Sequence, residues 1–145
     1  MKKTLLALAI CILATCASAV AQTGQDSLVV ALKPCVVYPA HALIGGTTTN
    51  FKIRGTCNVP TAATAVFAQV IVTSPSSAGS GFLWAYSTLT PLIPQFHYST
   101  VQDADGRALV ALCDPEPECG FADVSLKPTT TATVTVVVEG YLKPH

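Results

Sequence analysis

The sequence predicts an all-β fold, an antiparallel β-sandwich of about seven to eight short strands with two disulfides. From Gln22 onward the apolar residues come in short runs separated by turn-forming residues. The last run alternates between two faces with β-branched side chains on both, which is typical of a strand and not of a helix. An even number of cysteines follows an N-terminal secretory signal, as in exported disulfide-bonded domains.

Eight apolar runs are the candidate strands. They cover residues 27–32, 51–55, 65–73, 81–86, 96–100, 108–113, 122–126 and 132–138. In the second run the period-two alternation places Phe51 and Ile53 inward and the cations Lys52 and Arg54 outward.

Turn signals separate these runs. They are Gly45–Gly46, residues 76–81, Asp105–Gly106 and Lys127–Pro128. A helix is the alternative for the Ala-rich segment 61–70, but its Val, Ile and Phe content and the proline before it favour a strand from about Ala65. Gly140 interrupts the last strand, which indicates a bulge or a close backbone approach.

Residues 1–21 have the pattern of a cleavable secretory signal. Two lysines form its positive end, an apolar stretch follows, and small residues end at Ala21. We expect cleavage before Gln22, with Val20 as the alternative first residue. A single β-sandwich domain over residues 22–145 then remains.

A lipid anchor is the competing interpretation, because residues 13–16 resemble a lipobox that would make Cys16 a lipidation site. The threonine before Cys16 is unfavourable for this, and a good cleavage site follows. No later stretch approaches the roughly 20 apolar residues that a membrane anchor needs. We therefore expect an exported protein, periplasmic or extracellular, without a transmembrane segment.

Four cysteines remain after cleavage, and an even number in an exported chain predicts two disulfides. They are Cys35, Cys57, Cys113 and Cys119. A zinc site is a weak alternative, since no pair has C-x-x-C spacing and two prolines stiffen the segment 114–118. The sequence alone leaves the three possible connectivities open.

Past the signal the chain has six Lys/Arg and eight Asp/Glu, a formal charge of 6 − 8 = −2, with no basic cluster. Phosphate binding requires a concentrated positive face. Nucleic acid is therefore not an expected partner.

No catalytic, metal or cofactor site is predicted. His97 has Ser99 and Asp103 nearby, but no nucleophile turn accompanies them, so we interpret His97 as an outward strand residue. Asp103 and Asp105 resemble the opening of a calcium loop, which a simple Asp-Gly hairpin turn explains as well. His41 is assigned to a loop, and the acidic trio of residues 114–118 to a solvated loop.

Trp84 and Tyr86 are the candidate ligand-binding residues, because they share one face of their strand with Phe82. Such a face is either a stacking platform for carbohydrate or part of the core. Exposure of both rings on one flat face would favour the carbohydrate interpretation.

Several short motifs occur in an order that carries a family resemblance. They are residues 55–60 (G-T-C-N-V-P), 69–75 (Q-V-I-V-T-S-P), 81–83 (G-F-L), 92–98 (L-I-P-Q-F-H-Y), Leu112-Cys113, Cys119, Asp123-Val124 and 136–142 (V-V-V-E-G-Y-L). Together they resemble a family of bacterial exported β-sandwich domains, often uncharacterised, that occur in envelope-associated and extracellular proteins. The chain departs from the family after Cys35, where a C-R-[VIL]-x-D-T-R motif is replaced by C-V-V-Y-P-A, and Gln69 and His97 replace two family asparagines.

The resemblance implies a role in envelope or extracellular architecture and transfers no catalytic residue. With the geometry of the flanking segments, it favours pairing Cys35 with Cys57, and Cys113 with Cys119 across a turn between two adjacent antiparallel strands. We expect a non-enzymatic structural or adhesive module with an envelope protein or a glycan as partner. The alternatives are a carbohydrate-binding module, a hydrolase, and a pilus subunit completed by strand exchange.

Overall fold

The computed structural model describes residues 27–86, 88–100, 104–113, 119 and 121–145. Over these residues the chain forms eight β-strands and no helix, which confirms the predicted all-β class. The strands are β1 (Ser27–Leu43), β2 (Thr49–Phe51), β3 (Ala65–Thr73), β4 (Gly79–Ala85), β5 (Phe96–Tyr98), β6 (Ala104–Ala111), β7 (Val124–Pro128) and β8 (Ala132–Pro144). The signal segment lies outside the described residues. Among those described, no helix is long and apolar enough to cross a membrane.

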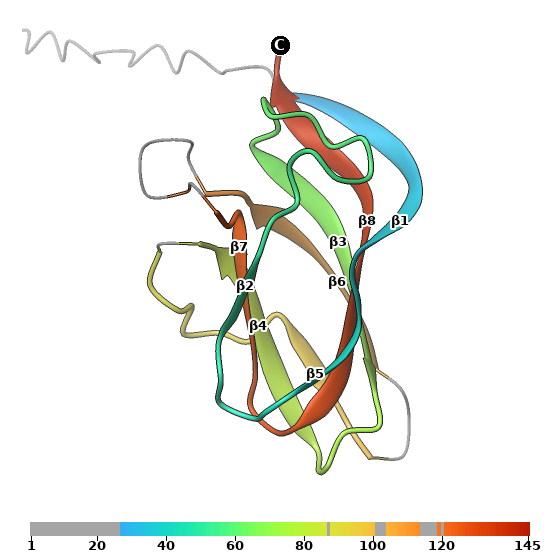
Figure 1. Cartoon of the computed structure of the whole chain (residues 1–145), viewed down its shortest axis with the longest axis vertical. Coiled ribbons are helices and arrows are strands. Elements are labelled where there is room, and N and C mark those ends of the chain that lie inside the picture. The colour runs from blue at the N-terminus through green and yellow to red at the C-terminus, as the bar shows by residue number, and fades with distance from the viewer. Residues whose placement is uncertain (1–26, 87, 101–103, 114–118, 120) are drawn as a thin grey trace, which may run out of the picture.

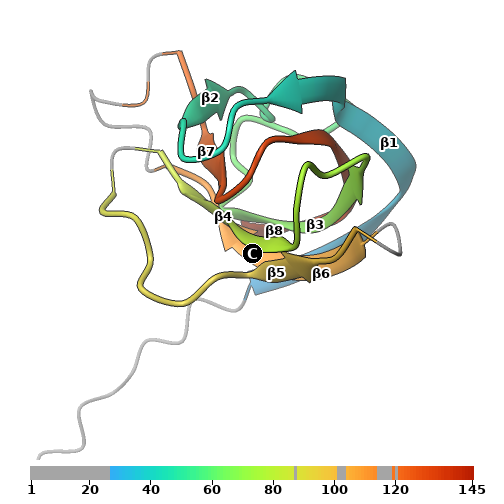
Figure 2. The same cartoon turned by 90° about the horizontal axis from the view of Figure 1, so that it is seen from below.

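The strands form two antiparallel sheets of four strands each, which face one another (Figures 1 and 2). The first sheet has the order β1-β8-β3-β6, and the second has the order β2-β7-β4-β5. Successive strands often lie in different sheets, so most of the connections cross between the layers. The predicted antiparallel sandwich is confirmed.

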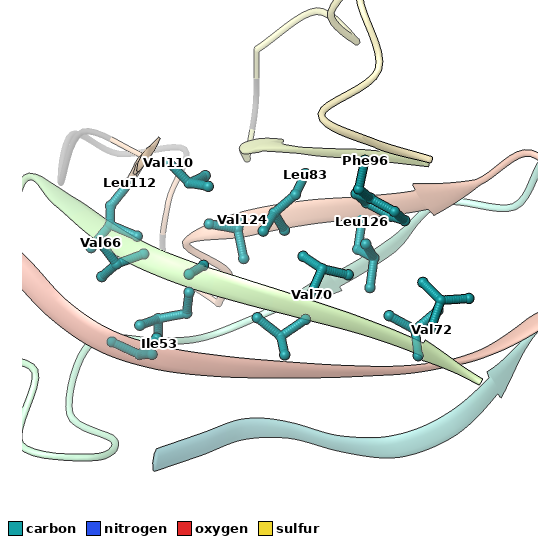
Figure 3. Close-up of a cluster of buried hydrophobic side chains, with 14 of the residues drawn as sticks. Ile53, Val66, Val70, Val72, Leu83, Phe96, Val110, Leu112, Val124 and Leu126 are labelled. Atoms are coloured by element: carbon teal, nitrogen blue, oxygen red, sulfur yellow. The ribbon is translucent and has the colours of Figure 1, made fainter. Parts of the chain in front are cut away.

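Side chains from both sheets meet in one core (Figure 3). Val66, Val70 and Val72 of β3 are at most 1% exposed, and Val124 and Leu126 of β7 are fully buried opposite them. Successive side chains on a strand alternate between its two faces, which explains why every second residue of β3 is buried. Burial of each such side chain contributes about 1.5–3 kcal/mol.

β3 has the predicted start and end, but two predicted turns are wrong. Asp105–Gly106 lies within β6, and Lys127–Pro128 ends β7. A Cβ on Gly106 would lie 2.5 Å from the Cβ of Phe96, so this glycine lets β5 pack closely against β6 instead of making a turn. The chain reverses after β7 at residues 129–131.

β1 continues to Leu43, well beyond the predicted end of that strand at residue 32. It is an edge strand with β8 on one side, so Pro34 and Pro39 do not interrupt pairing with a second neighbour. The pairing with β8 shifts register near both prolines. The assignment of His41 to a loop is therefore wrong, since His41 pairs with Val134 of β8.

Gly140 lies at a bulge in β8, as predicted. It pairs with Phe67 of β3, while Val138 pairs with the next residue of β3, so Glu139 is the extra residue. A Cβ at position 140 would lie 2.8 Å from the Val30 carbonyl oxygen of β1. The predicted close backbone approach is confirmed.

Replacing Gly140 with valine is expected to lower the free energy of unfolding by on the order of 1–3 kcal/mol, because the new side chain meets backbone on the neighbouring strand. Urea unfolding of the purified protein measures this. Thr135→Val, on the same strand and half-buried, is the control and should change stability by about 0.5 kcal/mol or less. A Gly140→Val protein as stable as the wild type would show that the bulge can accommodate a side chain.

Two disulfides join Cys35 to Cys57 and Cys113 to Cys119, which confirms the predicted pairing. One expectation about the second bridge is wrong, because the strands that flank it, β6 and β7, belong to different sheets. The first bridge also connects the layers, from β1 in the first sheet to the turn after β2 in the second. Two such bridges are typical of proteins that fold in an oxidising, exported environment.

Candidate binding site at one end of the sandwich

Three loops come together at one end of the sandwich. They are residues 52–64 between β2 and β3, the described residues of 86–95 between β4 and β5, and residues 112, 113, 119 and 121–123 between β6 and β7. The described part of the loop after β4 projects on the left in both Figure 1 and Figure 2. A network of buried hydrogen bonds holds all three together.

The side chain of Asp123 is the centre of this network. Its Oδ2 accepts hydrogen bonds from the backbone N–H groups of Ile53 and Arg54, each at 2.7 Å. Its Oδ1 accepts a hydrogen bond from Nη1 of Arg54 at 2.8 Å, which is also an ion pair. Asp123 is 2% exposed and Arg54 9% exposed, so water competes little for these bonds.

Arg54 completes the network, and its predicted outward position is wrong. Its Nε donates to the Ala63 carbonyl at 2.9 Å, and its Nη1 donates to the Cys113 carbonyl at 2.7 Å. β2 ends at Phe51, so residues 53 and 54 do not follow the strand alternation on which the prediction rested. Arg54 instead turns inward and satisfies carbonyl groups from two loops.

The backbone of Asp123 connects the loop after β4 to the other two loops. Its carbonyl accepts hydrogen bonds from the N–H groups of Tyr86 and Cys113 at 3.0 and 2.9 Å, and its own N–H donates to the Phe51 carbonyl at 3.0 Å. One residue therefore fixes the start of the loop after β4, the end of β6 and the end of β2. The base of this end is rigid because each bond is buried or main chain to main chain.

The two candidate ligand-binding residues lie at this end. Trp84 is 8% exposed and follows the core residue Leu83 on β4, so the two side chains lie on opposite faces of the strand. Its indole N–H donates to the Thr88 carbonyl at 3.2 Å. Tyr86 is half-buried, and its ring packs edge-on against Phe121 with centroids 5.4 Å apart. Trp84 offers little ring area for stacking, whereas Tyr86 and Phe121 form an aromatic pair at the surface. A binding role for Trp84 and Tyr86 stays a prediction.

Residues 88–95, here called the aliphatic loop, carry side chains that the sequence analysis did not identify as a site. Leu89, Leu92 and Ile93 are 94%, 99% and 76% exposed, and Phe121 on the neighbouring loop is 73% exposed. Among the described residues these are the four most exposed large apolar side chains. A sequence signal existed, since Pro91 and Pro94 disfavour a central strand for the aliphatic residues between them.

Among the described ionisable side chains, His97 lies on β5 and Tyr38 on β1. His97 points outward on β5 between buried Phe96 and Tyr98, as predicted. Within the described part of the chain no three His, Cys, Asp or Glu residues are grouped to hold a metal ion. Asp103 and the acidic residues of 114–118 lie outside the described residues. Burial raises the pKa of the Tyr38 phenol, whose ring packs on Phe51, so it stays protonated at neutral pH.

An open hollow of about 230 Å³ lies on the outer face of the first sheet. It is lined by Phe67, Ala68, Arg107, Ala108, Leu109 and Glu139. Arg107 and Glu139 pair with one another at 3.5 Å across its rim. The hollow therefore presents an apolar floor without an unpaired charge.

These features define a disulfide-bonded antiparallel β-sandwich with a rigid loop end and an apolar rim. Comparison with known proteins found no matching family model, no similar curated protein and no similar solved structure. The resemblance to bacterial exported β-sandwich domains thus stays a prediction.

Proposed function

We propose that this chain is an exported, non-enzymatic module that makes structural or adhesive contacts in the bacterial cell envelope or extracellular space, through the aliphatic loop and Phe121. The observation that carries the proposal is the high exposure of four large apolar side chains on two loops that are joined by the Tyr86–Phe121 ring contact. Burying each of them against a partner would contribute about 1.5–3 kcal/mol, before the cost of association. Exposed apolar clusters of this kind are typical of interaction sites.

The anchoring of these loops supports the same proposal. Asp123 fixes the first residue of the loop after β4 and the segment that carries Phe121, so the apolar side chains extend from a rigid base. A prearranged contact surface loses less conformational entropy on binding than a flexible one. Scaffold-mounted loops are also the usual location of binding residues.

The charge pattern of the two loops restricts the class of partner that can bind them. The aliphatic loop contains no charged residue, and the segment 114–118 next to Phe121 in sequence contains three acidic residues. Acidic residues close in sequence to Phe121 disfavour anionic partners such as acidic phospholipids. A neutral or basic apolar surface on an envelope protein fits this pattern better.

Co-sedimentation with isolated bacterial envelope fragments tests the proposal. Leu92→Ser combined with Ile93→Ser is expected to weaken binding at least about tenfold, because two exposed contact side chains are lost. Val36→Ser combined with Leu109→Ser, which removes exposed apolar side chains from the first sheet, is the matched control and should bind like the wild type. Equal binding by the loop variant and the wild type would refute the assignment of the contact surface.

A further inference from the structure

Three of the four sheet edges are blunted against pairing with another chain. β2 and β5, the edges of the second sheet, have three residues each. β6, one edge of the first sheet, carries the exposed charged residues Asp105 and Arg107 on either side of Gly106. Short or charged edge strands of this kind disfavour intermolecular pairing.

The fourth edge, β1, is protected against pairing with another chain along one half, and the other half has no such protection. Residues 33–43 contain Lys33, Pro34 and Pro39, and the pairing with β8 shifts register three times from Ala31 onward. Residues 28–32, here called the edge segment, read Leu-Val-Val-Ala-Leu and contain no charge, proline or glycine. Figure 1 shows β1 at the outer right of the sheet, with β8 on one side. The usual devices that block an edge are missing from this segment.

The main-chain groups that this segment presents outward can be identified. A Cβ on Gly140 would lie 2.8 Å from the Val30 carbonyl oxygen, so this carbonyl faces β8. Alternate residues of an antiparallel strand direct their N–H and C=O groups to opposite sides. Val29 and Ala31 therefore direct theirs away from β8, and both residues are exposed, Val29 by 60%.

We propose that the edge segment pairs with the same segment of a second copy of this chain, antiparallel about a twofold axis with Val30 opposite Val30. Twofold symmetry makes such a contact self-complementary. In this register Val29 of each copy exchanges hydrogen bonds with Ala31 of the other, and only residues of the regular segment are used. The two Lys33 ammonium groups stay apart, because each falls opposite residue 27.

The near-neutral charge of the chain permits this association. Past the signal segment the formal charge is only −2, so two copies do not repel strongly. The interface is small, below the size of stable complexes, so we expect a reversible dimer with a Kd of about 10–1000 µM. The pairing is independent of the aliphatic loop and goes beyond the proposed function.

Amide hydrogen exchange followed by NMR at increasing protein concentration tests the register. The Val29 and Ala31 amides should become protected as concentration rises, while the Leu28 and Val30 amides, which belong to the residues directed at β8, are protected at every concentration. Protection of all four amides that does not depend on concentration would contradict the pairing. Exchange that stays fast at Val29 and Ala31 up to about 1 mM protein would overturn the proposed pairing. At that concentration even a dimer with the weakest expected Kd is formed.

Sedimentation equilibrium of edge variants tests the same pairing by mass. Ala31→Pro removes an outward N–H and leaves the hydrogen bonds to β8, so it should give a monomer with unchanged unfolding. Val29→Lys should do the same by placing a charge on the edge. Val36→Lys, exposed on the register-shifted half of β1, is the matched control and should still dimerise. A dimer that persists in both edge variants would overturn the proposal. A wild type that stays monomeric but binds a synthetic peptide of residues 27–32 would also overturn the proposal. The natural partner of the edge segment would then be another protein and not a second copy of this chain.

Discussion

Replacing Asp123 with alanine is expected to lower the free energy of unfolding by about 3–5 kcal/mol, the range for breaking a buried ion pair by removing one partner. The carboxylate is 2% exposed and accepts hydrogen bonds from Ile53 N–H, Arg54 N–H and the Arg54 guanidinium. Its loss leaves two backbone donors unpaired and the Arg54 charge buried without a counter-ion. Each of these has its own desolvation penalty.

Urea unfolding with a fixed spectroscopic probe measures this loss. Arg107→Ala is the matched control, because it removes an ion pair of 3.5 Å whose cation is 69% exposed, and it should change stability by about 0.5 kcal/mol or less. Asp123→Asn keeps the size of the side chain, and its effect isolates the charge. An Asp123→Ala protein that loses no more stability than Arg107→Ala would refute the role of the network.

Removing the Cys35–Cys57 bridge is expected to destabilise the protein more than removing Cys113–Cys119. The bridges close loops of 22 and 6 residues. The chain-entropy relation gives about 3.4 and 2.2 kcal/mol for these lengths, as upper values. The longer bridge also fastens the edge strand β1 to the turn after β2, so its loss frees a connection between the two sheets.

Paired serine variants, Cys35→Ser with Cys57→Ser and Cys113→Ser with Cys119→Ser, provide the comparison by thermal and urea unfolding. Each pair is the control for the other, because both remove one disulfide and add two serines. Peptide mapping without reduction verifies that the remaining bridge is intact in each. Equal destabilisation, or a larger loss for the shorter loop, would contradict the ordering.

Strands whose side chains alternate between core and surface could be predicted from the sequence. β3 is the clearest example, because its alternation of Val with half-buried residues follows directly from the period of a strand. β1 was predicted too short, since Pro34 and Pro39 normally end a strand. An edge position tolerates them, and which strand becomes an edge depends on the pairing of segments far apart in sequence.

The errors at glycine and arginine have a common physical cause, which is contact between distant segments. Gly106 resembles a turn residue, but it is needed where Phe96 approaches β6. Arg54 resembles a surface cation, but Asp123, 69 residues later, accepts its hydrogen bond in a buried site. Local pattern cannot identify a partner that only the folded chain brings close.

The candidate site was predictable only in part. Trp84 and Tyr86 were identified by their shared face, but the covering of Trp84 by the segment at Thr88 depends on how that loop folds back. The exposure of Leu89, Leu92 and Ile93 accompanies their position in the connection between β4 and β5, where Pro91 and Pro94 disfavour a central strand. Apolar composition alone predicts burial for such residues.

The most direct test of the proposed contact surface is site-specific photo-crosslinking in cells that export the protein, with the photoreactive residue at position 92. The aliphatic loop is predicted to form a covalent adduct with an envelope component from this position, where the native Leu92 is 99% exposed. The same residue at position 36, exposed on β1 of the first sheet, is the control and is predicted to give no adduct. Absence of an adduct from position 92, or an equal adduct from position 36, would contradict the account.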